Sequence, residues 1–254
     1  MKSYFYMALA IFVSLILSLN PVKLVSLDEM GLFLTVIGII YGLMAAFTIS
    51  NAWERFSVIR DSISEETYAL TSAYIYAEEL SDKSGFGKFK AKLLEYCEEV
   101  PKVSWRLYWH SEKTHQKFRD IIKIVAQMKL KNIKDEHLFD EITTDLEDAA
   151  RARSSQLVLS HTRISSIQWI LNIALSLFLV AGLVFTSLPD YKLSIFIIFS
   201  MISSVLMILV VMYELDTMKV YEEEISNEPY WQIIHIIRGD KKSVLTDAGP
   251  DVFV

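Results

Sequence analysis

The most constraining feature of the sequence is a set of four apolar stretches, each about 17 to 23 residues long and almost free of ionised side chains. They cover residues 4–20, 30–50, 166–188 and 193–213. An α-helix rises about 1.5 Å per residue, so each stretch is long enough to cross a hydrocarbon layer about 30 Å thick. Four buried helices of a soluble core are the alternative, but such helices seldom run so long without charge. We therefore predict an all-α membrane protein with four transmembrane helices.

The first apolar stretch needs a separate decision, because it has the short basic start and the apolar centre of a secretory signal. A signal peptide is cleaved after small residues, whereas this stretch ends in Ser18-Leu19-Asn20-Pro21. We therefore predict that residues 4–20 are retained as the first transmembrane helix.

The charged residues make up 22% of the chain and are concentrated between Trp53 and Arg163. This segregation divides the chain into membrane, domain and membrane. We expect transmembrane helices 1 and 2 in residues 1–50, a helical domain in 51–165, transmembrane helices 3 and 4 in 166–213, and a C-terminal segment in 214–254.

The orientation follows from the basic residues beside the apolar stretches. On one side of the membrane the sequence places six of them: Arg55, Arg60, Arg151, Arg153, Arg163 and Lys219. The other side has only Lys23 and Lys192. Because basic residues accumulate on the cytoplasmic side, we predict a multi-pass protein of the cell membrane whose termini and central domain are cytoplasmic.

The second transmembrane helix does not stop where its apolar stretch ends, because the pattern turns amphipathic. Apolar residues keep to one helical face and skip one position near Glu66; they are Ala52, Phe56, Ile59, Ile63, Leu70, Ala73, Ala77 and Leu80. The pattern predicts one continuous helix to about Leu80, ending before a break at Gly85 and Gly87.

Three further helices are expected in the central domain. The first covers Phe89–Glu99, the second begins near Ser111 as N-cap, and the third begins near Asp135. We expect the third to merge through Leu157 into the third transmembrane helix, so that extensions of the second and third transmembrane helices form part of the domain. Near the C-terminus, residues 230–238 are amphipathic and would lie on the membrane surface or on a neighbouring subunit.

The sequence offers little that indicates an enzyme, a metal site or a nucleic-acid binder. The formal net charge is −6, without the basic excess that binds phosphates. No Gly-rich phosphate loop is present, and the five histidines, His110, His115, His137, His161 and His235, form no metal pattern. Paired carboxylates such as Glu65-Glu66 are typical of solvated helix faces, and Cys97 of a packed thiol. We expect no enzyme activity, no cofactor, no metal and no nucleic-acid partner.

The second transmembrane helix carries a stripe of small residues four apart. Its candidates for pore lining or close packing are Thr35, Gly38, Gly42, Ala46, Ser50 and Asn51. Such a stripe allows a neighbouring helix to approach closely. It would equally leave room for a water-filled or ion-filled path between copies of the same helix. The sequence leaves both interpretations open.

Polar and charged side chains near these helices form a second set of candidates. Gln168, Asn172 and Ser176 are four apart in the third transmembrane helix and would bond across helices or face water. In a symmetric oligomer, charged residues at the cytoplasmic boundary would repeat as rings that select the sign of an ion. The candidates are Glu54, Arg55, Arg60 and Asp216.

Residues 42–56 read Gly-Leu-Met-Ala-Ala-Phe-Thr-Ile-Ser-Asn-Ala-Trp-Glu-Arg-Phe, and residues 64–70 read Ser-Glu-Glu-Thr-Tyr-Ala-Leu. With the order of elements, these segments resemble the bestrophin-like domain family. Weaker matches are Tyr96, Arg163, Trp169 and the pair Leu215-Asp216, after which this chain departs from the family by reading Thr-Met-Lys-Val-Tyr. The resemblance implies four transmembrane helices and a cytoplasmic helical domain. By analogy with bestrophins, it also implies a ring of four or five subunits with the second helix lining the pore.

These observations predict a homo-oligomeric ion channel in a lipid membrane. The overall acidity favours cations and the bestrophin analogy favours anions, so the permeant ion stays undetermined. The alternative is a non-conducting membrane-anchored scaffold or signalling protein, whose cytoplasmic helical domain binds a partner.

Overall fold

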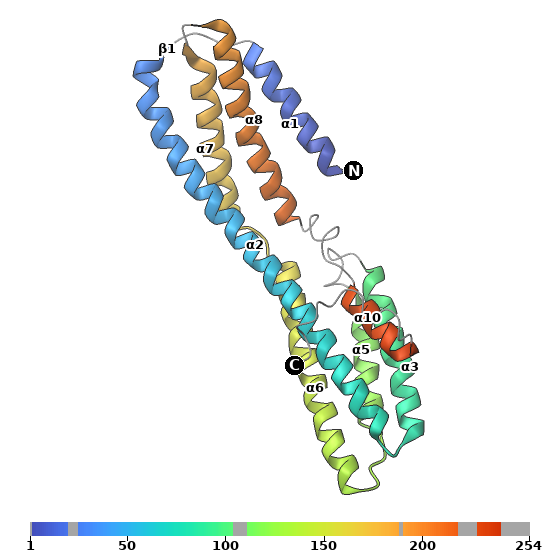
Figure 1. Ribbon diagram of the computed structural model, residues 1–254. Coiled ribbons are helices and arrows are strands. Elements are labelled where there is room, and N and C mark those ends of the chain that lie inside the picture. Colours follow the sequence, from blue (N-terminus) through green and yellow to red (C-terminus); the bar gives the residue numbers. More distant parts are fainter. Residues whose placement is uncertain (1, 20–24, 104–110, 188–189, 218–227, 240–254) are drawn as a thin grey trace, which may run out of the picture. The chain divides into compact units, whose positions relative to one another are not determined.

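The computed structural model describes residues 2–19, 25–103, 111–187, 190–217 and 228–239 (Figure 1). These residues are almost entirely helical, which confirms the prediction of an all-α fold. The helices are α1 Lys2–Leu19, α2 Leu27–Glu79, α3 Lys83–Glu99, the 3-10 turn η1 Val100–Lys102, α5 Glu112–Val125, α6 Ile133–His161, α7 Ser166–Phe185, α8 Tyr191–Asp216 and α10 Glu228–Arg238. His110 and Lys219 lie outside the described residues.

The chain divides into two compact units that share the long helix α2. The first unit consists of residues Met1–Arg55 and Arg163–Val220, and the second of Phe56–Thr162 and Tyr221–Val254. The apolar helices therefore belong to the first unit, and the charged central region, with the C-terminal helix α10, belongs to the second.

In the first unit, α2, α7 and α8 are long and apolar enough to cross a membrane. The apolar part of α1 covers Tyr6–Leu19 and is shorter than these three helices. Both α1 and α7 pack against α8. Two short strands, β1 Val25–Ser26 and β2 Thr186–Ser187, pair in parallel and join the start of α2 to the end of α7. The sequence had not indicated this pairing.

Small and aromatic residues hold the helices of the first unit together. Tyr41, Ala45, Leu179 and Val205 form one buried cluster that joins α2, α7 and α8. The Tyr41 hydroxyl donates to the Val205 carbonyl at 3.1 Å, so the one polar group of this cluster is satisfied. Gly182 permits another close approach, because a Cβ there would lie 2.6 Å from the Leu34 side chain.

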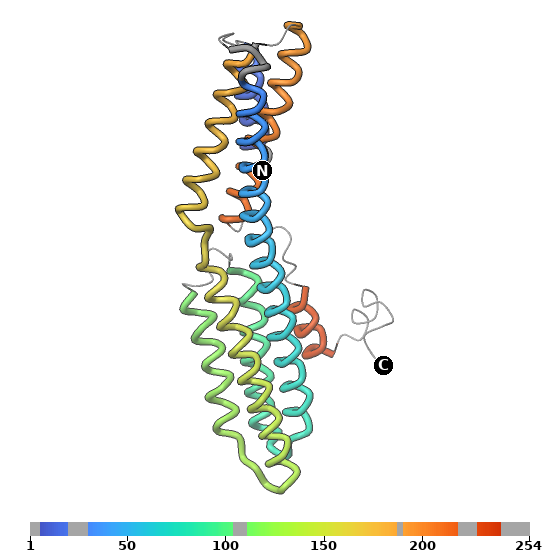
Figure 2. Tube along the Cα trace, turned by 90° about the vertical axis from the view of Figure 1, so that its left-hand side faces the viewer, coloured from blue at the N-terminus to red at the C-terminus, as the bar shows by residue number. Residues whose placement is uncertain are grey.

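The second unit is an antiparallel bundle of α2, α3, α5 and α6, with α10 lying against it (Figure 2). Side-chain bonds show which helices are neighbours. Ser62 of α2 bonds Ser155 of α6, Lys117 of α5 bonds the Glu95 carbonyl of α3, and α2 and α6 also meet through Lys134 and Glu79. Short connections join α2 to α3 and α5 to α6, so the order around the bundle is α2, α3, α5, α6 (Figure 2).

The prediction that α2 continues without interruption from the apolar stretch to about Leu80 is confirmed. The predicted break at Gly85 and Gly87 is wrong, because both glycines lie inside α3. The break falls earlier, where the Asp82 side chain caps α3 by accepting from the Gly85 amide. A Cβ on residue 85 would lie 2.6 Å from that carboxylate, so glycine is required for the cap rather than for a turn.

The prediction that the helix beginning near Asp135 merges into the third transmembrane helix is also wrong. The helix α6 ends at His161, and Thr162 has extended backbone angles. The helix α7 then starts afresh, because Ser165 and Gln168 form a capping box in which each side chain bonds the other's backbone. Of the apolar helices, therefore, α2 continues into the domain, and α7 does not.

Candidate functional site

The stripe of small residues on α2 lies mostly on the outer surface of the first unit. Thr35, Gly42, Ala46 and Ser50 are exposed, as is Asn51, and Gly38 is half-buried. A Cβ on Gly42 would meet no atom within 4 Å, whereas one on Gly38 would meet Leu179 at 3.9 Å. The contacts of this stripe inside one subunit are therefore few, and its surface is open to lipid, to a path or to another copy.

Large apolar residues share the exposed side of α2 with this stripe. They are Leu32, Val36, Ile39, Leu43 and Phe47, and all are exposed by more than 43%. At about 100° per residue, they lie beside the stripe rather than on it. The exposed side of α2 therefore has one narrow strip of small residues and one broad strip of bulky residues.

Two of the four proposed ring charges are bound inside the subunit instead. The Arg55 guanidinium is buried and donates to the Leu215 carbonyl at 2.9 Å. Glu54 and Arg60 are exposed on α2. Of the four predicted ring charges, Glu54 and Arg60 are therefore the two whose side chains are exposed on the surface of one subunit.

Asp216 fastens the start of α7 to the end of α8. Its carboxylate accepts from the Ile164 amide at 2.7 Å and from the Trp169 indole at 3.3 Å. Its backbone carbonyl accepts from Arg163 at 3.2 Å. Carbonyls at a helix C-terminus attract cations, so Arg55 and Arg163 both stabilise the end of α8.

The three polar candidates of α7 have three different roles. Gln168 caps the helix, and the Ser176 hydroxyl donates to the Ile173 carbonyl within it. Only Asn172 of the three bonds another helix in the described part of the chain, because its amide donates to Thr48 of α2 at 3.2 Å. The Asn172 carbonyl oxygen is buried and has no hydrogen-bond partner among the described residues. The side chain thus joins α2 to α7 and keeps one acceptor available.

A buried polar network lies at the centre of the second unit, around Glu66 of α2. Its carboxylate is fully buried and accepts from the Tyr96 hydroxyl of α3, from Gln156 of α6 at 2.7 Å and from the Tyr230 hydroxyl of α10 at 3.0 Å. Arg153 of α6 donates to the same Tyr96 hydroxyl. One carboxylate therefore connects four helices.

Arg153 extends this network to α5 and to the rings of Tyr96 and Phe118. It donates to the Thr114 hydroxyl of α5 at 3.1 Å. Its guanidinium carbon lies 5.3 Å from the Tyr96 ring centre and 5.5 Å from the Phe118 ring centre. Such cation–aromatic contacts favour the charged form of arginine in a buried place.

Burial raises the pKa of two titratable groups of this unit. Burial raises the pKa of the Glu66 carboxyl above its ordinary value of 4.5, while Arg153 and the three hydrogen bonds act in the other direction. Burial also raises the pKa of the Cys97 thiol well above its ordinary value. Cys97 is thus a packed and unreactive thiol.

The expectation that Glu65 and Glu66 both lie on a solvated face is wrong for Glu66, which is fully buried, and right for Glu65. The signal for the network was the skipped position in the apolar repeat of α2, where a carboxylate stands on the buried face. The partners Arg153, Gln156 and Tyr230 come from distant parts of the chain, and nothing local to them indicated the contact. Among the described residues, no group of three or more His, Cys, Asp or Glu side chains could hold a metal ion.

A family model for the Bestrophin-like domain matches residues 5–217. The chain belongs to the Bestrophin-like domain family. Comparison with curated proteins and with solved structures found no match. Membership of this family, together with the apolar helices α2, α7 and α8, indicates a membrane protein. The matched range of the Bestrophin-like domain ends at Thr217, so α10 and its Tyr230 complete the buried network from beyond the family domain.

Replacing Tyr230 by phenylalanine should destabilise the second unit of this Bestrophin-like protein by about 1 to 2 kcal/mol. The change removes the hydroxyl that Glu66 accepts and leaves the ring contact with Tyr96, at 6.5 Å between ring centres, in place. The measurement is urea unfolding of the full chain in detergent, followed by tryptophan fluorescence. Tyr68→Phe is the matched control, since Tyr68 is 77% exposed, and it should change stability by less than about 0.5 kcal/mol. Equal stability of the two variants would contradict the role of Tyr230.

The network also predicts a pH dependence of stability. Because the folded-state pKa of Glu66 is raised, its contribution is fully present below pH 4.5 and is lost as pH rises through the folded-state pKa. Glu66→Gln removes this titration and keeps one oxygen acceptor, for either Tyr96 or Tyr230, which donate to different oxygens of Glu66. The unfolding free energy of the wild type, relative to Glu66→Gln, should therefore fall as pH increases above 4.5. A constant difference over that range would show that Glu66 does not titrate with folding.

Proposed function

We propose that this Bestrophin-like protein forms a homo-oligomeric ion channel whose pore is lined by α2. The observation that carries the proposal is the exposed strip of small residues on α2, including Gly42, Ala46 and Ser50. A Cβ at Gly42 meets nothing inside the subunit, so close packing within one copy does not account for glycine there. When copies of one helix surround an ion path, small side chains on the facing surface leave room for the ions.

The exposed residues of the other apolar helices support the choice of α2. Large apolar side chains, which suit lipid, dominate there: Phe12 and Ile16 of α1, Ile170 and Leu177 of α7, and Leu193 and Phe196 of α8. The exposed Ser204 of α8 donates to the Ser200 carbonyl of its own helix, which satisfies its hydroxyl in a lipid environment. Among the apolar helices, α2 therefore offers the better candidate for a pore wall.

The arrangement in the membrane follows from helix packing and from charge. We assign α1 as the fourth transmembrane helix, because it packs against α8 and its exposed side is apolar. The basic residues beside the apolar helices favour a cytoplasmic location for the bundle of α2, α3, α5 and α6. The continuous helix α2 then leads from the pore into a cytoplasmic vestibule. By analogy with bestrophins, four or five subunits would surround the axis.

Ion flux through the purified protein in liposomes tests this function, with potassium, sodium and chloride gradients applied separately. Selective flux in one gradient is the expected result and identifies the permeant ion. A cross-linking ladder on the same sample gives the subunit number. No flux in any gradient, or a ladder that ends at two subunits, would instead favour the non-conducting membrane-anchored scaffold, because two four-helix units leave no shared axial path.

A further inference from the structure

The charges of the bundle are segregated between two opposite sides. In the order α2, α3, α5, α6, the α2–α6 side lies opposite the α3–α5 side (Figure 2). The α2–α3 side is covered by α10, through Tyr230 and Glu66 and through Arg238 and Glu98. We call the α2–α6 side the acidic flank and the α3–α5 side the basic flank.

The acidic flank presents carboxylates that no cation of the described residues pairs with. Asp61 and Glu65 are exposed beside Ser62, which bonds α6. Glu141 is exposed one turn before Asp145, whose carboxyl bonds Ser72 of α2. In the part of the chain that the structure describes, none of Asp61, Glu65 and Glu141 forms an ion pair.

Two apolar side chains lie among these carboxylates. Val58 of α2 is 40% exposed one turn before Ser62, and Val158 of α6 is 56% exposed three residues after Ser155. Because Ser62 and Ser155 bond each other, the two valines flank the same contact between helices. Exposed apolar groups surrounded by charge are typical of a surface that is covered in an assembly.

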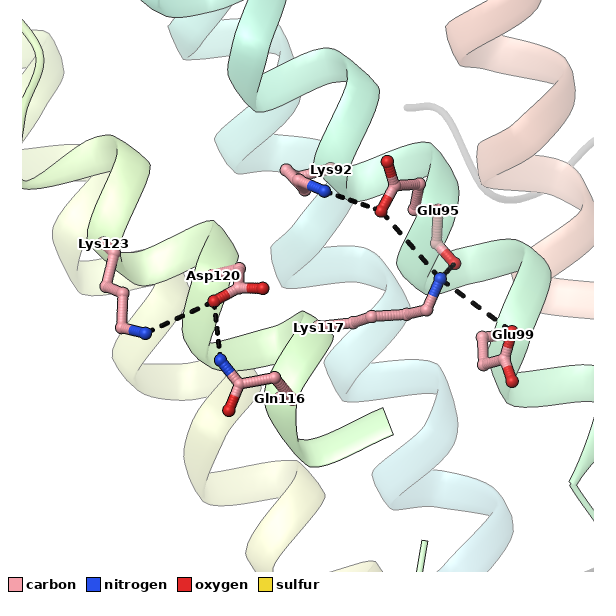
Figure 3. A network of polar contacts seen from close by, with 7 residues as sticks. All are labelled: Lys92, Glu95, Glu99, Gln116, Lys117, Asp120 and Lys123. Atoms are coloured by element: carbon pink, nitrogen blue, oxygen red, sulfur yellow. Dashed lines mark hydrogen bonds and ion pairs between the residues drawn. The ribbon is translucent and has the colours of Figure 1, made fainter. Parts of the chain in front are cut away.

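The basic flank has the opposite character, because its acids are already paired. Glu95 and Glu99 pair with Lys117, Glu95 also with Lys92, and Asp120 with Lys123 (Figure 3). Two more lysines lie on the same faces and are exposed: Lys88, one turn before Lys92, and Lys113, one turn before Lys117. Neither forms an ion pair among the described residues. This side therefore keeps a surplus of positive charge.

We infer that the acidic flank of one copy docks against the basic flank of the next copy. This interface deepens the proposed homo-oligomeric channel and rests on it. The occupant is a second copy of the chain because the same bundle carries both complementary surfaces, with uncompensated carboxylates on one and uncompensated lysines on the other. An interface between two different flanks is head-to-tail, and such an interface forms a ring, rather than a symmetric pair, when the rotation between successive copies closes. Val58 and Val158 then supply its apolar centre.

Charge reversal in the full-length chain tests the interface. The acidic-flank variant is Asp61→Lys with Glu65→Lys, and the basic-flank variant is Lys88→Glu with Lys113→Glu. No hydrogen bond or ion pair within the described residues depends on these four side chains, so each variant should keep the wild-type helicity and unfolding temperature. The oligomer mass is measured in mild detergent by light scattering, over a range of protein and salt concentrations.

Each reversal alone should raise the concentration at which the oligomer forms by at least about tenfold, and the chain that carries all four changes should assemble like the wild type. The wild-type oligomer should also weaken as salt increases. Glu78→Lys is the control, because Glu78 is exposed on α2 and lies about 160° around the helix from Ser62, so that it faces away from α6.

Three outcomes would overturn the interface: an oligomer insensitive to both reversals, a fourfold variant that assembles no better than the single-flank variants, and a monomeric wild type. The flux measurement separates this failure from that of the channel. If the charge reversals leave assembly unchanged and the oligomer still conducts ions, the proposed interface is wrong and the channel proposal stands. A ring that responds as expected but does not conduct would reject the channel alone.

Discussion

Replacing Arg153 by alanine should destabilise the second unit by about 3 to 5 kcal/mol, which is a large fraction of the stability of an ordinary domain. The change leaves the fully buried Glu66 without its cation, removes the bond to Thr114 and removes the guanidinium packed against Tyr96 and Phe118. Removing the cation near a buried carboxylate is costly because the remaining charge cannot be solvated. Urea unfolding of the full chain in detergent measures the loss.

Arg151→Ala is the matched control for this prediction. Arg151 lies two residues away on the same helix, and its side chain is 80% exposed and paired with Asp148 at 3.3 Å. An exposed pair of this kind contributes less than about 1 kcal/mol. The cost of Arg153→Ala should also grow with pH above 4.5, because a protonated Glu66 needs no cation. Similar stabilities of the two arginine variants would show that the buried network does not stabilise the bundle.

The course of α2 could be predicted because its evidence is local. Its apolar residues keep a helical repeat across the boundary between the apolar stretch and the charged region, with no proline or glycine to stop it before Leu80. The start of α5 at Ser111 was predictable for the same reason, since the Ser111 side chain accepts from the Thr114 amide three residues later.

The break between α6 and α7 had a local signal and a distant cause. Ser165 and Gln168 have the spacing of a capping box, which could have been recognised in the sequence. The extended segment before them is held by Asp216 through the Ile164 amide, across 52 positions of sequence. No pattern in a single sequence shows which amide such a carboxylate will bind.

The buried network shows the same limit more clearly. Glu66 interrupts an apolar repeat, and a carboxylate on the buried face of a helix implies a partner. Tyr230 lies 164 positions away, beyond the matched family domain. The periodicity of α10 correctly predicted an amphipathic helix. The prediction that this helix lies on the membrane surface or on a neighbouring subunit is wrong, because it packs against α3 of the same chain and its Tyr230 bonds Glu66.

Gly42→Leu should reduce ion flux to the level of protein-free liposomes while the oligomer stays intact. A Cβ at this position meets no atom of the same subunit within 4 Å, so the larger side chain does not disturb the fold. In a symmetric ring the substitution adds one isobutyl group from every copy of α2 at the same height. A narrow path is blocked by such a ring of side chains. The measurement is flux in liposomes, combined with the oligomer mass of the same preparation.

Ala181→Leu separates a blocked path from a general effect of bulk in the membrane. Ala181 is exposed on α7, among side chains such as Leu177 and Phe178 that suit lipid, so a leucine there should leave flux unchanged. If Gly42→Leu instead dissociates the oligomer, the stripe of α2 packs against a neighbouring copy. Unchanged flux through an intact Gly42→Leu oligomer would place the path elsewhere than along α2. If only Gly42→Leu abolishes flux and both variants have the same oligomer mass, the exposed stripe of α2 lines the pore. The same added side chain then blocks conduction on α2 and leaves it unchanged on α7.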